Sequence, residues 1–495
     1  MGPVKRVLLG SAAGVFAVAG AQAADLAVKA KPVEYVKVCS IYGAGFWYVP
    51  GTDTCIKIGA FVKLQLHEHM NSGGPFLMGA AANGAGDAGG RSDRVDTSQF
   101  SFNIRSAVSF DMRTQTEYGT LRSYFDAFFQ TTGSNVGTNQ LSSIVLGNTR
   151  GFIQFAGFTA GRMRSFFDMY FQGTYAFAGQ RFGGDTSPNG IVGAAYTWQF
   201  GGGLSASLSL EDNGQGNSGR GRSTVNLSQA GALGVGTNTF NNKGQEFFDP
   251  VANLRLDQQW GFVGASVALH DASGGYYSNG PAGPGVLEGN GHPADKYGWA
   301  ATAAFLINSP FGLTGDTVAG QAVYSKGAAG YATVTWGPWA NFSAGQKVSL
   351  GWMEEGVFTT GSNVELTTVW SANAAYEHRW SPQWRTSLYG GIIGVQYDGT
   401  AKTAVCANLA ATIITARTNC DPNFSLTELG SRTMWNPVPD LDVGVDVVWY
   451  HMKTAFGGGV ANLAANLGAK PAGQYAISNL DALATVFRIQ RNFLY

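Results

Sequence analysis

The side chains from Phe100 to Arg113 alternate between two kinds, and this alternation limits the possible folds more than any other feature of the chain. The even positions are mostly apolar, and they are Phe100, Phe102, Ile104, Ser106, Val108, Phe110 and Met112. The odd positions are mostly polar or charged, and they are Ser101, Asn103, Arg105, Ala107, Ser109, Asp111 and Arg113. A period of two predicts a β-strand, because successive side chains leave opposite faces of a sheet.

A second alternating run follows a short polar segment. Leu121, Phe125 and Phe129 share one face, whereas Arg122 and Asp126 lie on the other. The two runs predict an antiparallel hairpin, which suits either a soluble β-sandwich or a transmembrane barrel. About 9 to 11 tilted residues cross the apolar part of a bilayer, and the first run is longer than that.

The same alternation recurs along the chain and predicts about sixteen strands, with about fourteen and about eighteen as the alternative counts. Val348–Trp352 is a candidate for one more strand. Short turns alternate with long connections rich in Gly, Asn and Ser. The predicted strands lie near residues 55–66, 99–113, 120–130, 148–156, 159–166, 190–200, 203–211, 250–259, 261–270, 296–307, 317–326, 364–380, 384–397, 427–436, 441–451 and 483–495.

Three features favour the barrel over the sandwich. The predicted strands have one apolar and one polar face, and their connections are alternately short and long. Only 13% of all residues are charged, where about 25% is usual for soluble proteins. We therefore predict an all-β fold, a transmembrane antiparallel up-and-down barrel, closed because an open edge would leave backbone groups unpaired in lipid. Aromatic residues near strand ends are expected at the headgroup boundary. They are Phe46, Trp47, Tyr48, Trp198, Phe200, Trp260, Phe262, Trp380, Trp384, Phe493 and Tyr495.

The first 23 residues have the pattern of a secretory signal peptide. Two basic residues precede an apolar run that is too short to span a membrane, and Ala21-Gln22-Ala23 has the small residues of a cleavage site. We expect a periplasmic N-terminal extension with a plug-like segment at 24–54 and the barrel at 55–495. Loss of the two basic residues leaves a formal charge of about −2, which gives no indication of a nucleic-acid partner.

The four cysteines lie in two local pairs, Cys39 with Cys55 and Cys406 with Cys420. Four cysteines allow three pairings, and export makes disulfides possible. We predict the local pairing, because it closes short loops and leaves no odd thiol. The spacing of Cys and His residues does not predict a metal site, and we expect neither a metal nor a cofactor.

Four separated motifs resemble the general porins of alphaproteobacterial outer membranes. They are CSIYGAGFWYVPGTDTCIKIG at 39–59, RTQTEYGTLR at 113–122, GRMRSFFD at 161–168 and GSRTMWNPV at 430–438. The resemblance implies a water-filled channel of about sixteen strands, assembled as a homotrimer in the outer membrane among lipid and lipopolysaccharide. It also implies that one long connection, Phe166–Asn189, folds into the pore and narrows it.

Charged residues on the polar strand faces and on this connection are the candidates for the pore lining, because low-dielectric walls focus their field. The alternative for Arg105, Arg162 and Arg164 is a lumen position away from the narrowest point, and the alternative for Asp168 is a loop-anchoring hydrogen bond. The candidates are Lys57, Lys63, Arg105, Asp111, Arg113, Arg122, Asp126, Arg162, Arg164, Asp168 and Asp185.

Together with the resemblance, these features predict an outer-membrane channel for the passive diffusion of small hydrophilic solutes and ions, and not an enzyme. A substrate-specific channel for a sugar or an anion is the first alternative. An enzyme built on an outer-membrane barrel is the second alternative.

Overall fold

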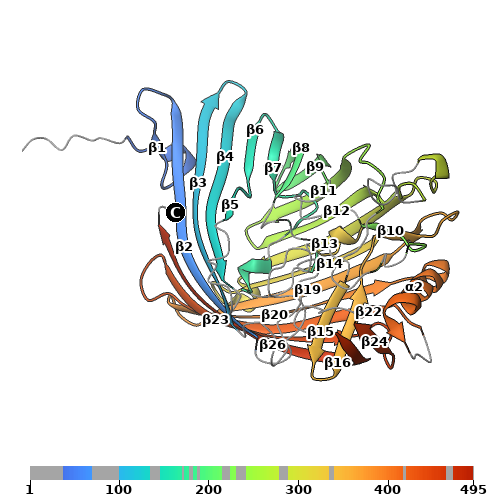
Figure 1. Cartoon of the computed structure of the whole chain (residues 1–495). Helices are drawn as coiled ribbons and strands as arrows, with labels where there is room; N and C mark the ends of the chain where they lie inside the picture. Colours follow the sequence, from blue (N-terminus) through green and yellow to red (C-terminus); the bar gives the residue numbers. More distant parts are fainter. Residues whose placement is uncertain are drawn as a thin grey trace, which may run out of the picture.

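The computed structural model describes residues 37–69, 100–133, 145–169, 172–177, 182–184, 186, 190–213, 223–229, 233, 241–277, 288–333, 339–415, 420–463 and 472–493. In this part of the chain, eighteen strand segments form one sheet. One segment, β1 (Trp47–Tyr48), is a short addition beside β2, and β5 and β6 are two pieces of one strand, so the wall has sixteen strands. The last strand pairs with the first, which closes the barrel as predicted (Figure 1).

Each wall strand runs antiparallel to its neighbours, and the predicted segments are found in the predicted order. The strands are β2 (Thr54–His69), β3 (Phe100–Thr116), β4 (Gly119–Gly133), β5 (Val145–Gly147), β6 (Gly151–Phe155), β7 (Phe158–Met163), β8 (Ile191–Gly201), β9 (Leu204–Glu211), β11 (Asp249–Gln258), β12 (Gly261–Asp271), β13 (Tyr297–Asn308), β14 (Thr317–Lys326), β19 (Thr368–Arg379), β20 (Trp384–Gln396), β22 (Phe424–Trp435), β23 (Leu441–Lys453) and β26 (Leu480–Phe493).

The outer face of the wall is apolar and the inner face is polar, which reverses the arrangement of a soluble protein. Side chains predicted on the apolar face are exposed, for example Leu64 at 40%, Phe129 at 55% and Leu254 at 53%. Residues of the opposite face are covered, such as Ser209 at 1% and Asp446 at 0%. Exposed apolar side chains around the wall suit contact with lipid, and the predicted two-faced strands are confirmed.

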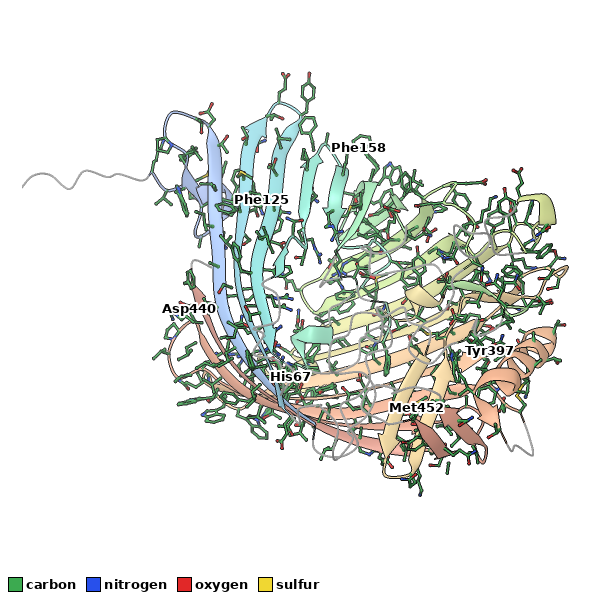
Figure 2. The ribbon with its side chains drawn as sticks, in the orientation of Figure 1. His67, Phe125, Phe158, Tyr397, Asp440 and Met452 are labelled. Carbon is green, nitrogen blue, oxygen red and sulfur yellow. A yellow bond between two sulfur atoms is a disulfide. The ribbon has the colours of Figure 1, made fainter. Side chains whose placement is uncertain are left out.

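Short turns lie at one end of the barrel and long connections at the other. Figure 2 shows Phe158, beside a short turn, and Tyr397, among the long connections, at opposite ends of the wall. Trp260 and Trp380 at the short-turn end are 44% and 67% exposed, as expected for residues at a membrane boundary. The same prediction is wrong for Phe46, which is 5% exposed and packs against Cys39 and Cys55. It is also wrong for Phe262, which is 6% exposed and lies under the guanidinium of Arg255 at 3.7 Å.

The long connections that follow β9 fold into a roof over part of the barrel mouth (Figure 1). The candidate strand Val348–Trp352 belongs to this roof and not to the wall. Helix α2 (Gly399–Thr412) packs there through Ala401, Val405 and Leu409, which are four residues apart and buried. The roof strands are β10 (Thr224–Asn226), β15 (Trp339–Ala344), β16 (Lys347–Trp352), which contains that candidate, β17 (Gly356–Phe358), β18 (Glu365–Leu366), β21 (Ile414–Thr415), β24 (Val460–Leu463) and β25 (Gly473–Ile477).

Both predicted disulfides are present, and they lie at opposite ends of the molecule. Cys39–Cys55 ties the N-terminal extension to β2, and Phe46 is buried beside it. Cys406–Cys420 joins α2 to the segment that leads into β22. The predicted signal peptide and the first part of the extension lie outside the described residues. Among the residues that are described, no helix is long and apolar enough to cross a membrane.

We expect replacement of Cys406 and Cys420 by Ser to loosen the roof and leave the barrel intact. A disulfide that closes a loop of about 15 residues stabilises a fold by about 3 kcal/mol, so the protection of the α2 amides against hydrogen exchange should fall by a similar free energy. Hydrogen exchange measured by mass spectrometry checks this. The same change at Cys39 and Cys55 is the control, and equal loss of α2 protection in both variants would contradict the assignment.

Candidate functional site

The connection between β7 and β8, residues 164–190, crosses the lumen. Its Phe166 carbonyl accepts hydrogen bonds from Asn253 Nδ2 at 2.9 Å and Ser266 Oγ at 3.1 Å, on the inner faces of β11 and β12. Farther along, the Tyr175 hydroxyl lies 3.1 Å from Thr317 Oγ1 at the start of β14. The connection therefore leaves its own strands and runs along the opposite part of the wall. We call it the constriction loop.

The constriction loop reaches the strands that close the barrel. The backbone N–H of Phe177 donates to a carboxylate oxygen of Asp446 on β23. The ring of Phe177 lies 3.7 Å from the guanidinium carbon of Arg488 on β26 and 5.3 Å from that of Arg432 on β22. On the return path, the Phe182 carbonyl accepts a hydrogen bond from Asn373 on β19. These contacts confirm the prediction that this connection folds into the barrel.

Two buried carboxylates hold the root of the constriction loop. Glu211, at the end of β9, is 0% exposed and accepts hydrogen bonds from Ser165 Oγ at 2.6 Å and the Phe166 N–H at 2.8 Å. Asp168 accepts hydrogen bonds from the N–H and hydroxyl of Thr186 at 2.7 and 2.5 Å. Asp168 thus has the loop-anchoring contact that was the alternative to a pore-lining role, whereas Asp185 lies outside the described residues.

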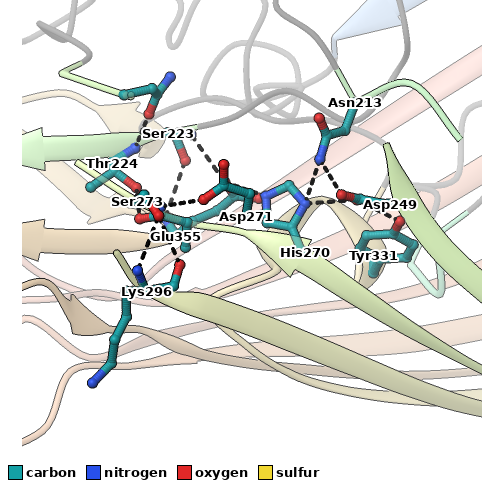
Figure 3. Close-up of polar contacts among 12 residues, drawn as sticks. Asn213, Ser223, Thr224, Asp249, His270, Asp271, Ser273, Lys296, Tyr331 and Glu355 are labelled. Carbon is teal, nitrogen blue, oxygen red and sulfur yellow. Dashed lines mark hydrogen bonds and ion pairs between the residues drawn. The ribbon is translucent and has the colours of Figure 1, made fainter. Parts of the chain in front are cut away.

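A buried histidine joins the wall to the roof (Figure 3). His270 on β12 is 1% exposed and lies between two carboxylates, with Nδ1 2.7 Å from Asp249 Oδ2 and Nε2 3.0 Å from Glu355 Oε2. Asp249 belongs to the wall strand β11, and Glu355 lies in the roof beside β17. Asp249 also accepts hydrogen bonds from Asn213 Nδ2 at 2.5 Å and from the Tyr331 hydroxyl at 2.7 Å.

Tyr331 connects this cluster to the constriction loop. Its ring packs edge-on against Phe167, with 4.8 Å between the ring centroids. Its carbonyl oxygen lies so close to Gly184 that a Cβ there would collide with it, and Gly184 has a positive φ of 71° that favours glycine. The root of the loop, the wall and the roof therefore share one buried network. Glu211 and His270 were not among the candidates from the sequence, because their partners are far away in the sequence.

The wall from β26 through β2 and β3 to β4 is strongly basic on its inner face. The register places seven of the predicted pore-lining residues there, together with Arg488, which was not predicted. Its inward position could have been predicted from the sequence. Arg488 lies between Phe487 and Ile489, two apolar residues whose side chains are on the outer face. Lumen-facing residues on these strands comprise six basic and two acidic side chains: Lys57, Lys63, Arg105, Arg113, Arg122 and Arg488, with Asp111 and Asp126.

The carboxylates of both acidic residues of this wall form ion pairs or hydrogen bonds with neighbouring groups. Asp111 forms ion pairs with Arg113 at 2.8 Å and Arg122 at 2.9 Å. The carboxylate of Asp126 accepts hydrogen bonds from the Thr149 N–H at 2.8 Å, the Thr149 hydroxyl at 2.7 Å and the Arg150 N–H at 3.0 Å. Asp126 thereby caps the break between β5 and β6. The basic side chains consequently dominate the field along this side of the lumen.

Arg162 does not share the lumen-facing row. Its register neighbours are Gly151 on β6 and Val192 on β8, and Val192 is 45% exposed on the outer surface. The inner face of β7 is formed instead by residues such as Thr159, which is 7% exposed. The prediction that Arg162 faces the lumen is therefore wrong. Arg164 lies just beyond β7, where the Nε and Nη2 atoms are buried and have no hydrogen-bond partner among the described residues.

The strands that adjoin this basic wall, from β23 back to β19, carry paired charges. Arg432 Nη2 lies 2.7 Å from Glu377 Oε2, and Arg385 lies 3.7 Å from the same carboxylate and 3.5 Å from Asp442. Within the described part of the chain, no group of three or more His, Cys, Asp or Glu side chains is arranged to hold a metal ion. The chemistry that this site offers is a polar passage between a charged wall and an inserted loop.

Comparison with known sequence families supports the same conclusion. The family described as "Porin subfamily" matches residues 25–478. The chain belongs to this porin family. Family membership together with the closed barrel makes the protein an integral outer-membrane protein.

Known porins share parts of this sequence. Porin Omp2a of Brucella ovis is 38% identical over 134 residues, which cover 27% of this chain and 33% of Omp2a. Porin Omp2b of Brucella abortus is 29% identical over 280 residues, which cover 54% of this chain and 65% of Omp2b. The matches thus span less than two thirds of either relative.

A solved structure shares the fold. The outer membrane channel DcaP of Acinetobacter baumannii superposes with a TM-score of 0.56 at 12% sequence identity. The match covers 90% of this chain and 99% of DcaP. At that identity, the likeness shows a common barrel architecture.

Proposed function

We propose that this porin forms a water-filled channel for the passive diffusion of small hydrophilic solutes and ions across the outer membrane. The observation that carries the proposal is a closed barrel, apolar outside and polar inside, whose lumen is narrowed by a loop held by wall residues such as Asn253 and Asp446. Such a wall lets water and ions cross where lipid does not. The excess of basic residues on β26, β2, β3 and β4 supports a preference for anions.

We also propose a cleavable signal peptide at 1–23, a periplasmic extension at 24–54, and assembly as a homotrimer surrounded by lipid and lipopolysaccharide. The outward position of Arg162 supports a protein neighbour on that side of the barrel, because a guanidinium group is unfavourable against lipid. Chemical crosslinking of the detergent-solubilised protein tests the trimer. Bands at the monomer position alone would contradict it.

The pore assignment is tested by the ion selectivity of two arginine variants. Arg105→Ala removes a positive charge from the lumen face of β3, so the reversal potential under a salt gradient should shift toward cations, with about a twofold or larger change in the permeability ratio. Arg162→Ala is the matched control, because this arginine lies in the outward row, and its reversal potential should stay at the wild-type value. Equal shifts in the two variants would count against a lumen role for Arg105.

A further inference from the structure

The lumen wall has a depression across β2, β3 and β4. Register pairs Phe61 with Ala107, and Ala107 with Phe128, so a small residue lies between two phenylalanines in one row. The next row toward the short turns begins with Gly59 and Ser109. Because these side chains are small, they leave a cavity of about 120 Å³, which these residues line. We call this depression the ring niche.

The sides of the ring niche are aromatic although they face the lumen. Phe61 is on the same face of β2 as Lys57 and Lys63, and Phe128 is on the same face of β4 as Arg122. Tyr124 also lines the cavity and stacks on Phe152, with 5.3 Å between the ring centroids. Large aromatic side chains on a water-facing surface are a common mark of a binding site.

Positive charge borders the ring niche on the side of the long connections. The adjacent row contains Lys63 and Arg105. The guanidinium of Arg105 lies 4.2 Å from the centroid of the Phe128 ring, and its Nε donates a hydrogen bond to Gln130 Oε1 at 2.7 Å. Among the described residues that line the cavity, Asp126 is the one acid, and its carboxylate accepts the hydrogen bonds that cap the strand break.

We propose that the ring niche is a weak binding subsite for small anionic solutes that carry a flat ring, such as an aromatic monocarboxylate. The ring lies over Ala107 between Phe61 and Phe128, and the carboxylate meets the field of Lys63 and Arg105. Such a subsite would concentrate these solutes at the wall without a conformational change of the protein. This inference rests on the proposed function, because it needs an open channel that brings solutes to the wall.

The chemistry of the floor favours a flat ring over a sugar. A sugar needs hydrogen-bond partners for several hydroxyl groups, and unpaired polar groups cost free energy on binding. Gly59 and Ala107 offer no side-chain donor or acceptor. Ser109 offers one hydroxyl, which contacts the Gly59 carbonyl at 3.5 Å. The aromatic sides match the faces and edges of a planar ring.

The test measures how solutes block the current through single channels of the full-length protein in a planar bilayer. Benzoate is the probe, acetate controls for charge without a ring, and benzamide controls for a ring without charge. We expect benzoate to block at a concentration about tenfold or more below that of acetate or benzamide, because only benzoate uses both the aromatic sides and the charged border. Arg105→Gln should remove the preference for benzoate over benzamide.

Two neighbouring residues of β4 give a matched pair of variants. Phe128→Ala removes one side of the niche and should raise the half-blocking concentration of benzoate about threefold to tenfold. Phe129→Ala should leave it unchanged, because Phe129 is 55% exposed on the outer face. If both variants weaken the block equally, the effect comes from disturbance of β4 and the inference is overturned.

The remaining outcomes separate the inference from the proposed function. A wild-type channel that conducts but responds equally to benzoate and acetate overturns the ring niche and leaves the channel in place. A channel that is blocked by glucose and not by benzoate also overturns it, in favour of a sugar site. A purified protein that inserts into the bilayer without any conductance contradicts the proposed function itself.

Discussion

Glu377→Gln should destabilise the barrel by about 3–5 kcal/mol, the usual cost of breaking a buried ion pair from one side. Glu377 lies 2.7 Å from Arg432, whose side chain is only 4% exposed. It also lies 3.7 Å from Arg385. A neutral glutamine leaves both guanidinium groups without their shared negative charge. The measurement is the urea midpoint of unfolding in lipid vesicles, followed by tryptophan fluorescence.

A double variant and a surface control make this prediction specific. Glu377→Gln combined with Arg432→Met removes both charges, and it should recover most of the lost stability because no unpaired charge stays in the wall. Glu365→Gln changes an exposed glutamate and should shift the stability by less than about 0.5 kcal/mol. A single variant as stable as the wild type would show that Arg432 does not depend on Glu377.

Glu211→Ala should release the root of the constriction loop. The carboxylate accepts hydrogen bonds from Ser165, from the backbone of Phe166 and from Ser209 at 2.6, 2.8 and 2.8 Å. Each buried donor that loses its partner costs about 1–3 kcal/mol, so the loop should lose several kcal/mol of local stability. We expect a larger and noisier single-channel conductance, with faster hydrogen exchange at the Phe166 amide.

Ser205→Ala is the control for this variant. Ser205 lies on the same face of β9, but its hydroxyl contacts the Arg255 carbonyl at 3.5 Å and not the loop. Its conductance should equal that of the wild type. If Glu211→Ala also keeps wild-type conductance and exchange, the loop is held mainly by its contacts along β11 to β26.

The wall could be predicted from the sequence because one physical constraint acts on every strand. Lipid favours apolar side chains at outward positions, so residues such as Leu64 and Phe129 mark the register without any knowledge of their neighbours. The two disulfides could also be predicted without knowledge of distant neighbours, because they join cysteines that are only 16 and 14 residues apart.

The pairing of charges could not be predicted in the same way. Alternation shows that Asp126 faces inward, but it does not show that the carboxylate caps a strand break formed by residues 148–150. On β7 the alternation itself is weak, because Thr159, Ala160 and Gly161 differ little in polarity, and Arg162 was assigned to the wrong face. The roof segments have no regular alternation of apolar and polar residues from which their structure could be predicted. Contacts such as that of His270 with Glu355 join residues that are 85 positions apart in the sequence.

The final strand has a consequence for the order of assembly. β26 pairs with both β23 and β2, so it is the seam at which the wall becomes continuous. It also carries Arg488, against which the Phe177 ring of the constriction loop is seated. A nascent chain that still lacks this strand has two unpaired edges and no seat for the loop tip. The pore can therefore reach its final width only after β26 has paired with both β23 and β2. A complete wall is thus the precondition for a pore that selects among solutes.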